Sequence, residues 1–235
     1  EGLITVGDIT KTYMNIYDSS ILSKANTQYS NIIETLEADL LVAEGFIESH
    51  FFAGFSGGRK SVLPGIADRR TVLYNHNAGF IAHPCARAGN LLGNPVHADM
   101  LYAARAARLA FICNVVLGPD RNVVYATAGD CALAHEAGCA FVHKWCSVPR
   151  VAADIVVTSN GGYPLDQNVY QAVKGLSTAQ GAVKKGGVIV MLAQAADGHG
   201  GEAFLSDFVR ARDLVHLEET IMRTRPEDTR PDQWQ

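Results

Sequence analysis

The sequence is that of an ordinary globular protein of moderate size. Its 235 residues are 48% hydrophobic and 19% charged, a balance that excludes an intrinsically disordered chain. The formal net charge is −4, and no apolar run reaches the roughly 18 residues that a membrane span requires. Because there is also no stripe of Lys and Arg, we expect neither a membrane nor nucleic acid as the main partner.

The cysteines suggest the cellular compartment of the protein, and the chain ends suggest that the sequence is a fragment. Five cysteines is an odd number without paired spacing, which favours a reducing compartment, so we expect a cytoplasmic protein. No basic segment precedes an apolar one at the N-terminus, as an export signal would require. The chain begins at Glu1 without a methionine and ends at Gln235 within an expected helix, so we expect a fragment of a longer protein.

Strands and helices are expected to alternate along the chain. Apolar runs predict strands at residues 3–6, 39–45, 109–117, 122–127, 153–158 and 188–193. Helical spacing predicts helices at residues 19–37, 97–108, 130–146 and 167–185 and from residue 202, with a helical turn at 72–77. This alternation is typical of βαβ units, so we predict an α/β fold with largely parallel sheets. Val148–Arg150 is the only plausible linker, which predicts two α/β domains, 1–147 and 150–235, with a cleft between them.

The segment His50–Gly65 is the first candidate site. It follows the strand at 39–45, which we expect to be buried on both faces, and its glycines let the backbone approach a ligand closely. His50 opens the segment, and Lys60 follows a Gly-Gly-Arg turn. An imidazole, bare backbone amides and an amine together suit an anionic ligand beside a group that needs a base or a nucleophile.

A second candidate site follows the strand at 153–158. Open α/β sheets bind ligands beyond the carboxyl ends of their strands, where this chain has Ser-Asn-Gly-Gly and then a helix. Gln171 and Lys174 lie three residues apart, so they share a helix face and could hold a carboxylate. The alternative is an ordinary solvated lysine beside a surface glutamine. A third glycine-rich loop, 196–202, is expected at the same edge of the sheet.

Two other patterns carry less weight. Gly54–Ser61 nearly fits the phosphate-binding pattern G-x-x-x-x-G-K-S, but Arg59 replaces the second glycine, which argues against a nucleotide triphosphatase. Cys131, His135, Cys139 and His143 recur at every fourth residue like metal ligands. Each step drifts about 40° around a helix, so a buried stripe is the better interpretation.

Several motifs together resemble the nickel-pincer lactate racemase family. They are His50-Phe-Phe-Ala-Gly-Phe-Ser-Gly-Gly-Arg-Lys60, Tyr74-Asn-His-Asn77, Gly93-Asn-Pro95, Asn114-Val-Val-Leu117, Ala134-His135, Ser159-Asn-Gly-Gly-Tyr-Pro-Leu-Asp166 and Tyr170-Gln-Ala-Val-Lys174. The resemblance covers most of the chain. It implies racemisation or epimerisation of a small, lactate-like 2-hydroxy acid by reversible hydride transfer to a nickel-pincer nucleotide.

The resemblance also assigns roles to individual residues. Cofactor-maturation proteins would install the nucleotide, which would be attached covalently to Lys60. His76 would be the nickel ligand. His50 would be one of two acid/base histidines, and the remaining assignments are the phosphate contacts Ser56, Gly57 and Gly58, the substrate holders Gln171 and Lys174, and the pocket residues Tyr170 and Trp234. Residues 1–147 would then carry the cofactor, and residues 150–235 would close over the substrate.

One departure from the family pattern leaves an alternative open. The family's second catalytic histidine lies upstream of any matching segment in this chain, so this chain is expected to lack it. The alternative function is therefore a non-catalytic relative that binds an anionic nucleotide or acid.

Overall fold

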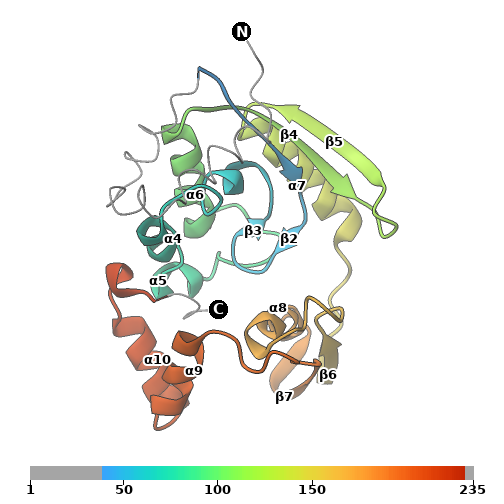
Figure 1. Cartoon of the computed structure of the whole chain (residues 1–235). Helices are drawn as coiled ribbons and strands as arrows, with labels where there is room; N and C mark the ends of the chain where they lie inside the picture. Colours follow the sequence, from blue (N-terminus) through green and yellow to red (C-terminus); the bar gives the residue numbers. More distant parts are fainter. Residues whose placement is uncertain (1–38, 231–235) are drawn as a thin grey trace. The chain divides into compact units, whose positions relative to one another are not determined.

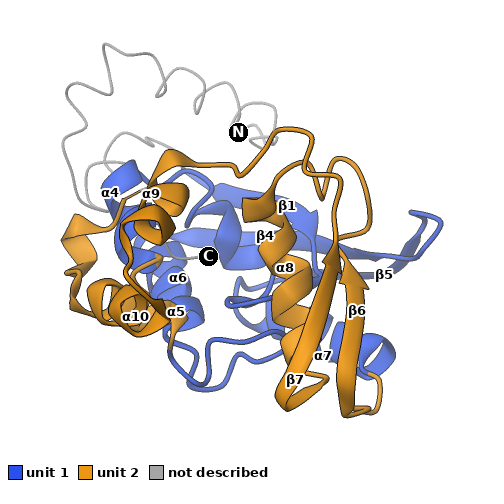
Figure 2. Ribbon diagram, turned by 90° about the horizontal axis from the view of Figure 1, so that it is seen from below, with its two compact units in different colours: residues 1–75, 83–147 blue, residues 76–82, 148–235 orange. Residues whose placement is uncertain are grey.

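The computed structural model describes residues 39–230, which divide into two compact units. One unit runs up to Asn75 and continues at His83–Ser147; the other comprises His76–Ala82 and the chain from Val148 onward (blue and orange in Figure 2). The expected strand at 3–6, the expected helix at 19–37 and Trp234 lie outside the described residues. The expected cleft between the domains stays a prediction.

The sheet of the first unit has three strands. The parallel partners β1 (Leu41–Phe46) and β4 (Leu109–Leu117) are followed by β5 (Val123–Gly129), which pairs antiparallel with β4 (Figure 1). The strands predicted at 39–45, 109–117 and 122–127 are thus confirmed. The expectation that the first of them is buried on both faces is wrong, because Glu44 and Phe46 are exposed in β1.

A short hairpin and a turn of 3₁₀-helix follow β1. The hairpin pairs β2 (Ser49–His50) with β3 (Gly54–Phe55), and η1 (Gly58–Ser61) comes directly after it. Helix α4 (Arg69–Asn75) ends one residue before His76, so the helical turn expected to carry that histidine stops short of it. The chain delivers the first candidate site to the carboxyl end of β1, as the sequence predicts.

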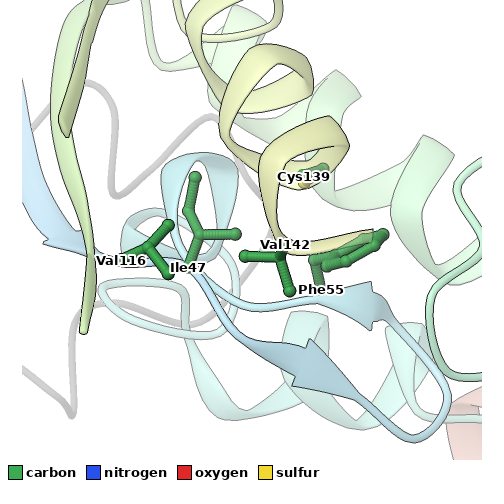
Figure 3. Packing of buried hydrophobic residues seen from close by; sticks show 5 residues of the cluster. All are labelled: Ile47, Phe55, Val116, Cys139 and Val142. Atoms are coloured by element: carbon green, nitrogen blue, oxygen red, sulfur yellow. The ribbon is translucent and has the colours of Figure 1, made fainter. Parts of the chain in front are cut away.

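Two longer helices complete the first unit. Helix α6 (Pro95–Ala106) begins at Asn94, whose side chain accepts hydrogen bonds from the amides of Val96 and His97. Helix α7 (Leu133–Cys146) packs against β4 and β5. Figure 3 shows the buried cluster that joins this helix to the sheet and the hairpin: Ile47, Phe55, Val116, Cys139 and Val142.

The second unit is built on a βαβ arrangement. Strands β6 (Ala153–Ser159) and β7 (Val183–Leu192) are parallel, with α8 (Val169–Gln180) between them in the chain. The helix ends at Gln180 and not at Lys185 as predicted, because Gly181 caps it and Lys184 belongs to β7. The remaining elements are α5 (Ala78–Ile81), α9 (Glu202–Arg210), α10 (Leu214–Arg223) and η2 (Pro226–Asp228).

The parallel pairings β1–β4 and β6–β7, with helices packed on them, confirm the predicted α/β class. In the part of the chain that the structure describes, no helix has the length and apolar character needed to cross a membrane.

Candidate functional site

His50 lies at the end of β2, where the hairpin turns. Its Nδ1 accepts a hydrogen bond from the Ala53 amide at 3.2 Å, which assigns the proton of a neutral ring to Nε2. The imidazole is partly exposed and packs against two aromatic rings, Phe51 at 4.9 Å and Phe52 at 4.7 Å between centroids. These contacts fix the orientation of the ring, as a general acid or base requires.

The two glycines before Arg59 are required by the fold of the loop itself. Gly57 has φ +75° and Gly58 has φ +53°, which is the left-handed region that favours glycine. A Cβ on Gly57 would lie 2.9 Å from the carbonyl oxygen of Phe46, and one on Gly58 would lie 2.9 Å from the His135 ring. The close approach that these glycines permit is therefore an approach to other parts of the protein.

The backbone amides of the two glycines differ. The Gly58 N–H donates to Asn114 Oδ1 at 2.8 Å, and Asn114 is fully buried in β4, so this amide is already used by the protein. No residue in the described part of the chain accepts a hydrogen bond from the Gly57 N–H. Of the two amides expected to meet a phosphate, only that of Gly57 has no acceptor within residues 39–230.

Ser56 connects the loop to the end of β1. Its hydroxyl donates to the Phe46 carbonyl at 3.0 Å and accepts from the Glu48 amide at 2.8 Å. Its own amide donates to the Glu48 carbonyl at 2.9 Å. Because the hydroxyl proton is directed at a carbonyl, Ser56 can offer a ligand only a lone pair in this arrangement.

Arg59 is the most unexpected residue of the loop, because its side chain is fully buried. Within hydrogen-bonding distance of the guanidinium are the imidazole nitrogens His97 Nδ1 and His135 Nε2 and the carbonyl oxygens of Ala53, Phe55, Ser56 and Gly57. From the sequence, Arg59 served only to reject a nucleotide-phosphate loop, and His97 received no role. The structure makes both part of the loop's support.

Burial and charge act in the same direction on this cluster. Burial and the Arg59 charge lower the pKa of His135 to about 3 and that of His97 to about 4. Burial also lowers the pKa of Arg59 to about 10, which leaves the guanidinium charged at neutral pH. The result is one buried cation held by neutral groups.

The structure agrees with the rejection of the nucleotide-phosphate loop and of the metal-ligand pattern. Gly58–Ser61 forms only a turn of 3₁₀-helix, and the next α-helix after it begins at Arg69, whereas a nucleotide-phosphate loop leads directly into a helix. Along α7, His135 and Cys139 are buried while His143 is exposed, so the four residues spaced like metal ligands do not share one face. Cys131, the first of the four, is buried ahead of the helix.

Lys60 and His76 belong to different units. Lys60 lies in η1 with its amide donating to the Gly57 carbonyl at 3.1 Å, and its side chain is partly exposed. His76 is also partly exposed, between α4 and α5. Both are placed as residues that a bound group could reach, and their roles stay predictions.

The second candidate site lies at the N-terminus of α8. Asn168 caps the helix, accepting from the Gln171 amide at 2.9 Å, and Lys174 Nζ donates to Gln171 Oε1 at 2.7 Å. The shared helix face predicted from their spacing is confirmed. Both side chains are only partly exposed, which counts against the alternative of a freely solvated lysine.

The glycine-rich loop after β7 packs against the start of α8. The amides of Val169 and Tyr170 donate to the carbonyls of Gly198 and His199 at 3.0 and 3.1 Å, so the two loops meet at one edge, as predicted. The Tyr170 ring is buried and packs edge-on against Phe204 of α9, with 5.6 Å between centroids. Only a small part of this ring is left to line a pocket.

Family models match both halves of the chain. Residues 23–89 match the lactate racemase N-terminal domain, and residues 148–235 match the lactate racemase C-terminal domain. Together they include both candidate sites, in the order in which the sequence presents them.

Individual relatives give the same result. The chain is 55% identical over 198 residues to the lactate racemase of Lactiplantibacillus plantarum, and 54% identical over 200 residues to that of Thermoanaerobacterium thermosaccharolyticum. These matches cover 84% and 85% of this chain, which spans about half the length of each relative, 47%.

A solved structure supports the fold directly. The lactate racemase apoprotein from Thermoanaerobacterium thermosaccharolyticum aligns with a TM-score of 0.82 at 53% identity, covering 87% of this chain and 48% of that one. With two matching domain models, two relatives above 50% identity and a shared fold, the chain belongs to the lactate racemase family.

Proposed function

We propose that this chain is part of an enzyme that racemises or epimerises a small 2-hydroxy acid, with lactate as the first substrate to test. The observation that carries the proposal is the contact between Lys174 and Gln171, which presents an ammonium and an amide together at the N-terminus of a helix. Such a set of donors suits a carboxylate with a hydroxyl beside it. Both curated relatives are named lactate racemase.

The implied cofactor is a nickel-pincer nucleotide, and the residues of the first loop suit it. Lys60 is partly exposed, the Gly57 amide three residues before it has no acceptor within residues 39–230 and could donate to a phosphate, and His76 is a partly exposed imidazole suited to nickel. We propose Lys60 as the covalent tether and His76 as the nickel ligand. When bound, the cofactor supplies an electrophilic centre that accepts a hydride from the substrate.

The roles of the protein's own residues follow from this chemistry. We assign His50 to exchange the hydroxyl proton of the substrate through Nε2. While Nδ1 accepts from the Ala53 amide, Nε2 carries the ring proton and can return it to the substrate; to remove a proton, Nε2 must first give its own up. Gln171 and Lys174 would bind the carboxylate and keep the flat 2-keto acid in the site, and inversion requires its opposite face to be turned toward the cofactor before the 2-hydroxy acid forms again. Tyr170 and Trp234 are proposed to line the pocket.

The domain roles and partners complete the proposal. Residues 1–147 would carry the cofactor and residues 150–235 the substrate-holding helix, and maturation proteins would install the nucleotide. We place the protein in the cytoplasm, which its five free cysteines support, because Cys113 and Cys146 are exposed thiols.

Mass spectrometry and metal analysis test the proposal. Full-length protein co-expressed with the maturation proteins should carry a mass adduct on Lys60 and bind nickel. His76→Ala should lose nickel, whereas His50→Ala should keep nickel and lose racemisation of lactate. An unmodified Lys60 without nickel after full maturation would favour a non-catalytic binder of anions, and nickel lost from His50→Ala but not from His76→Ala would overturn the assignment of roles.

A further inference from the structure

The residue before the proposed tether is a buried cation with an unusual set of partners. Arg59 has no exposed surface, and no carboxylate in the described part of the chain pairs with it. Its partners are backbone carbonyls and two imidazole nitrogens. Burying a charge that is held only by dipoles costs desolvation free energy, which indicates a structural role of the guanidinium.

The carbonyl partners all come from the segment just before Arg59. Nη2 donates to the Ala53 carbonyl at 2.8 Å, and Nη1 donates to that of Phe55 at 2.8 Å and, over longer distances, to those of Ser56 and Gly57. The chain from β3 to η1 therefore curves around the side chain of Arg59. Because the guanidinium is a rigid planar fork, it sets where these carbonyls lie relative to one another.

The two histidines hold the guanidinium in place from other elements. His97 of α6 accepts from Nε at 3.0 Å, and His135 of α7 lies 2.8 Å from Nη1 through Nε2. His135 Nε2 also lies 2.9 Å from the Ser56 carbonyl, and one nitrogen cannot both accept from Arg59 and donate to Ser56. We assign it as the acceptor, because an N–H directed at the guanidinium would face a positive charge, and the Ser56 carbonyl can accept from Nη1 instead. Both imidazoles act as neutral acceptors, and they tie the loop to two helices.

The direction of the Arg59 side chain fixes that of Lys60. Both residues belong to η1, and successive side chains of a 3₁₀-helix point about 120° apart. Since Arg59 points into the protein, Lys60 must leave on another side, and it is partly exposed. Rotating η1 to bury Lys60 would take Arg59 away from His97 and His135, which belong to other elements.

We propose that Arg59 is a positioning residue, whose guanidinium, clamped between His97, His135 and the loop carbonyls, aims Lys60 at the group that it tethers. This inference rests on the proposed function of Lys60 as the tether. The role requires the shape of the guanidinium, because a lysine ammonium is a single point that cannot reach the same carbonyls and imidazoles at once.

The experiment compares Arg59→Met and Arg59→Lys in the full-length protein co-expressed with the maturation proteins. The control is Leu109→Ala, which truncates a buried side chain at the start of β4. Leu109 pairs with the start of β1, at the opposite end of that strand from the loop. For each variant, the folded fraction from gel filtration is analysed for the mass adduct on Lys60. Hydrogen exchange of the apoproteins reports on residues 53–61.

Arg59→Met should reduce the fraction of Lys60 that carries the adduct at least tenfold, and Arg59→Lys should reduce it at least threefold. In both apoproteins, residues 53–61 should exchange at least tenfold faster, whereas Leu109→Ala should lower the melting temperature and leave both readouts within twofold of wild type. If Arg59→Met does not fold, His97→Phe, which removes one acceptor, should still reduce the adduct about threefold.

An adduct level in Arg59→Lys equal to wild type would overturn the positioning role. So would an equal loss in Leu109→Ala, because the effect would then be one of general stability. A wild-type protein with no adduct on Lys60 refutes the proposed function instead, and the exchange of residues 53–61 then decides whether Arg59 orders the loop.

Discussion

Removing the side chain of Asn114 tests whether the glycine loop depends on a single buried acceptor. Asn114 is fully buried in β4, and its Oδ1 accepts the Gly58 N–H at 2.8 Å. Asn114→Ala leaves that N–H without a partner, which costs about 1–3 kcal/mol, and the truncation adds about 1 kcal/mol for the space left behind. We therefore expect the free energy of unfolding to fall by about 2–4 kcal/mol, or the melting temperature by about 5–10 °C.

Urea unfolding at pH 7 measures this loss, and hydrogen exchange locates it. The Gly58 amide should exchange at least tenfold faster in Asn114→Ala than in wild type. The control is Asn122→Ala, in the exposed turn between β4 and β5, where Asn122 contacts Asp120 and the change should stay within about 0.5 kcal/mol. An Asn114→Ala protein as stable as this control, with Gly58 still protected, would refute the reasoning.

Three further changes test other parts of the structure. Gly58→Ala forces φ +53° on a residue with a Cβ and places that atom 2.9 Å from the His135 ring, so urea unfolding should show a loss of about 1–3 kcal/mol. The pKa of His135 is about 3 in the folded protein, so between about pH 3 and pH 6.5 only the unfolded chain binds a proton at this imidazole. The contribution of the neutral imidazole to stability is therefore complete above about pH 6.5 and is lost as the pH falls toward 3. The free energy of unfolding measured in urea should therefore fall by about 1–2 kcal/mol through this histidine between pH 7 and pH 5, with a flatter pH dependence in His135→Leu. Lys174→Met removes the ammonium beside Gln171 and should lower kcat/KM for lactate about 10- to 100-fold in matured full-length protein, and an unchanged value would exclude Lys174 from substrate binding.

The features that local spacing determines were predictable. The apolar run from Leu109 to Leu117 stands between Arg108 and a Gly-Pro turn, so the predicted strand coincides with β4. The contact between Gln171 and Lys174 follows from an i, i+3 relation within one helix. The ends of the strand are set by adjacent residues, and the two side chains of the contact are neighbours in the sequence.

The support of the first loop was not predictable in the same way. An arginine after two glycines is expected at the surface, because charged side chains are rarely buried without a counter-ion. Arg59 is buried because His97 and His135, 38 and 76 residues further along, supply neutral acceptors. Asn114 likewise reaches Gly58 across 56 residues. Nothing in the local pattern signals such partners, and only the packing of α6, α7 and β4 brings them together.

The curved segment around Arg59 has a practical meaning for protein engineering. The carbonyls of residues 53, 55, 56 and 57 contact one guanidinium, and Gly54 and Gly57 have positive φ. A library that inserts or deletes residues there would therefore disrupt the support of Lys60, the proposed tether. If Gln171 and Lys174 hold the substrate as proposed, a change of substrate preference is better sought around the start of α8. The partners of the Arg59 guanidinium within residues 39–230 all lie elsewhere, at positions 53–57, 97 and 135.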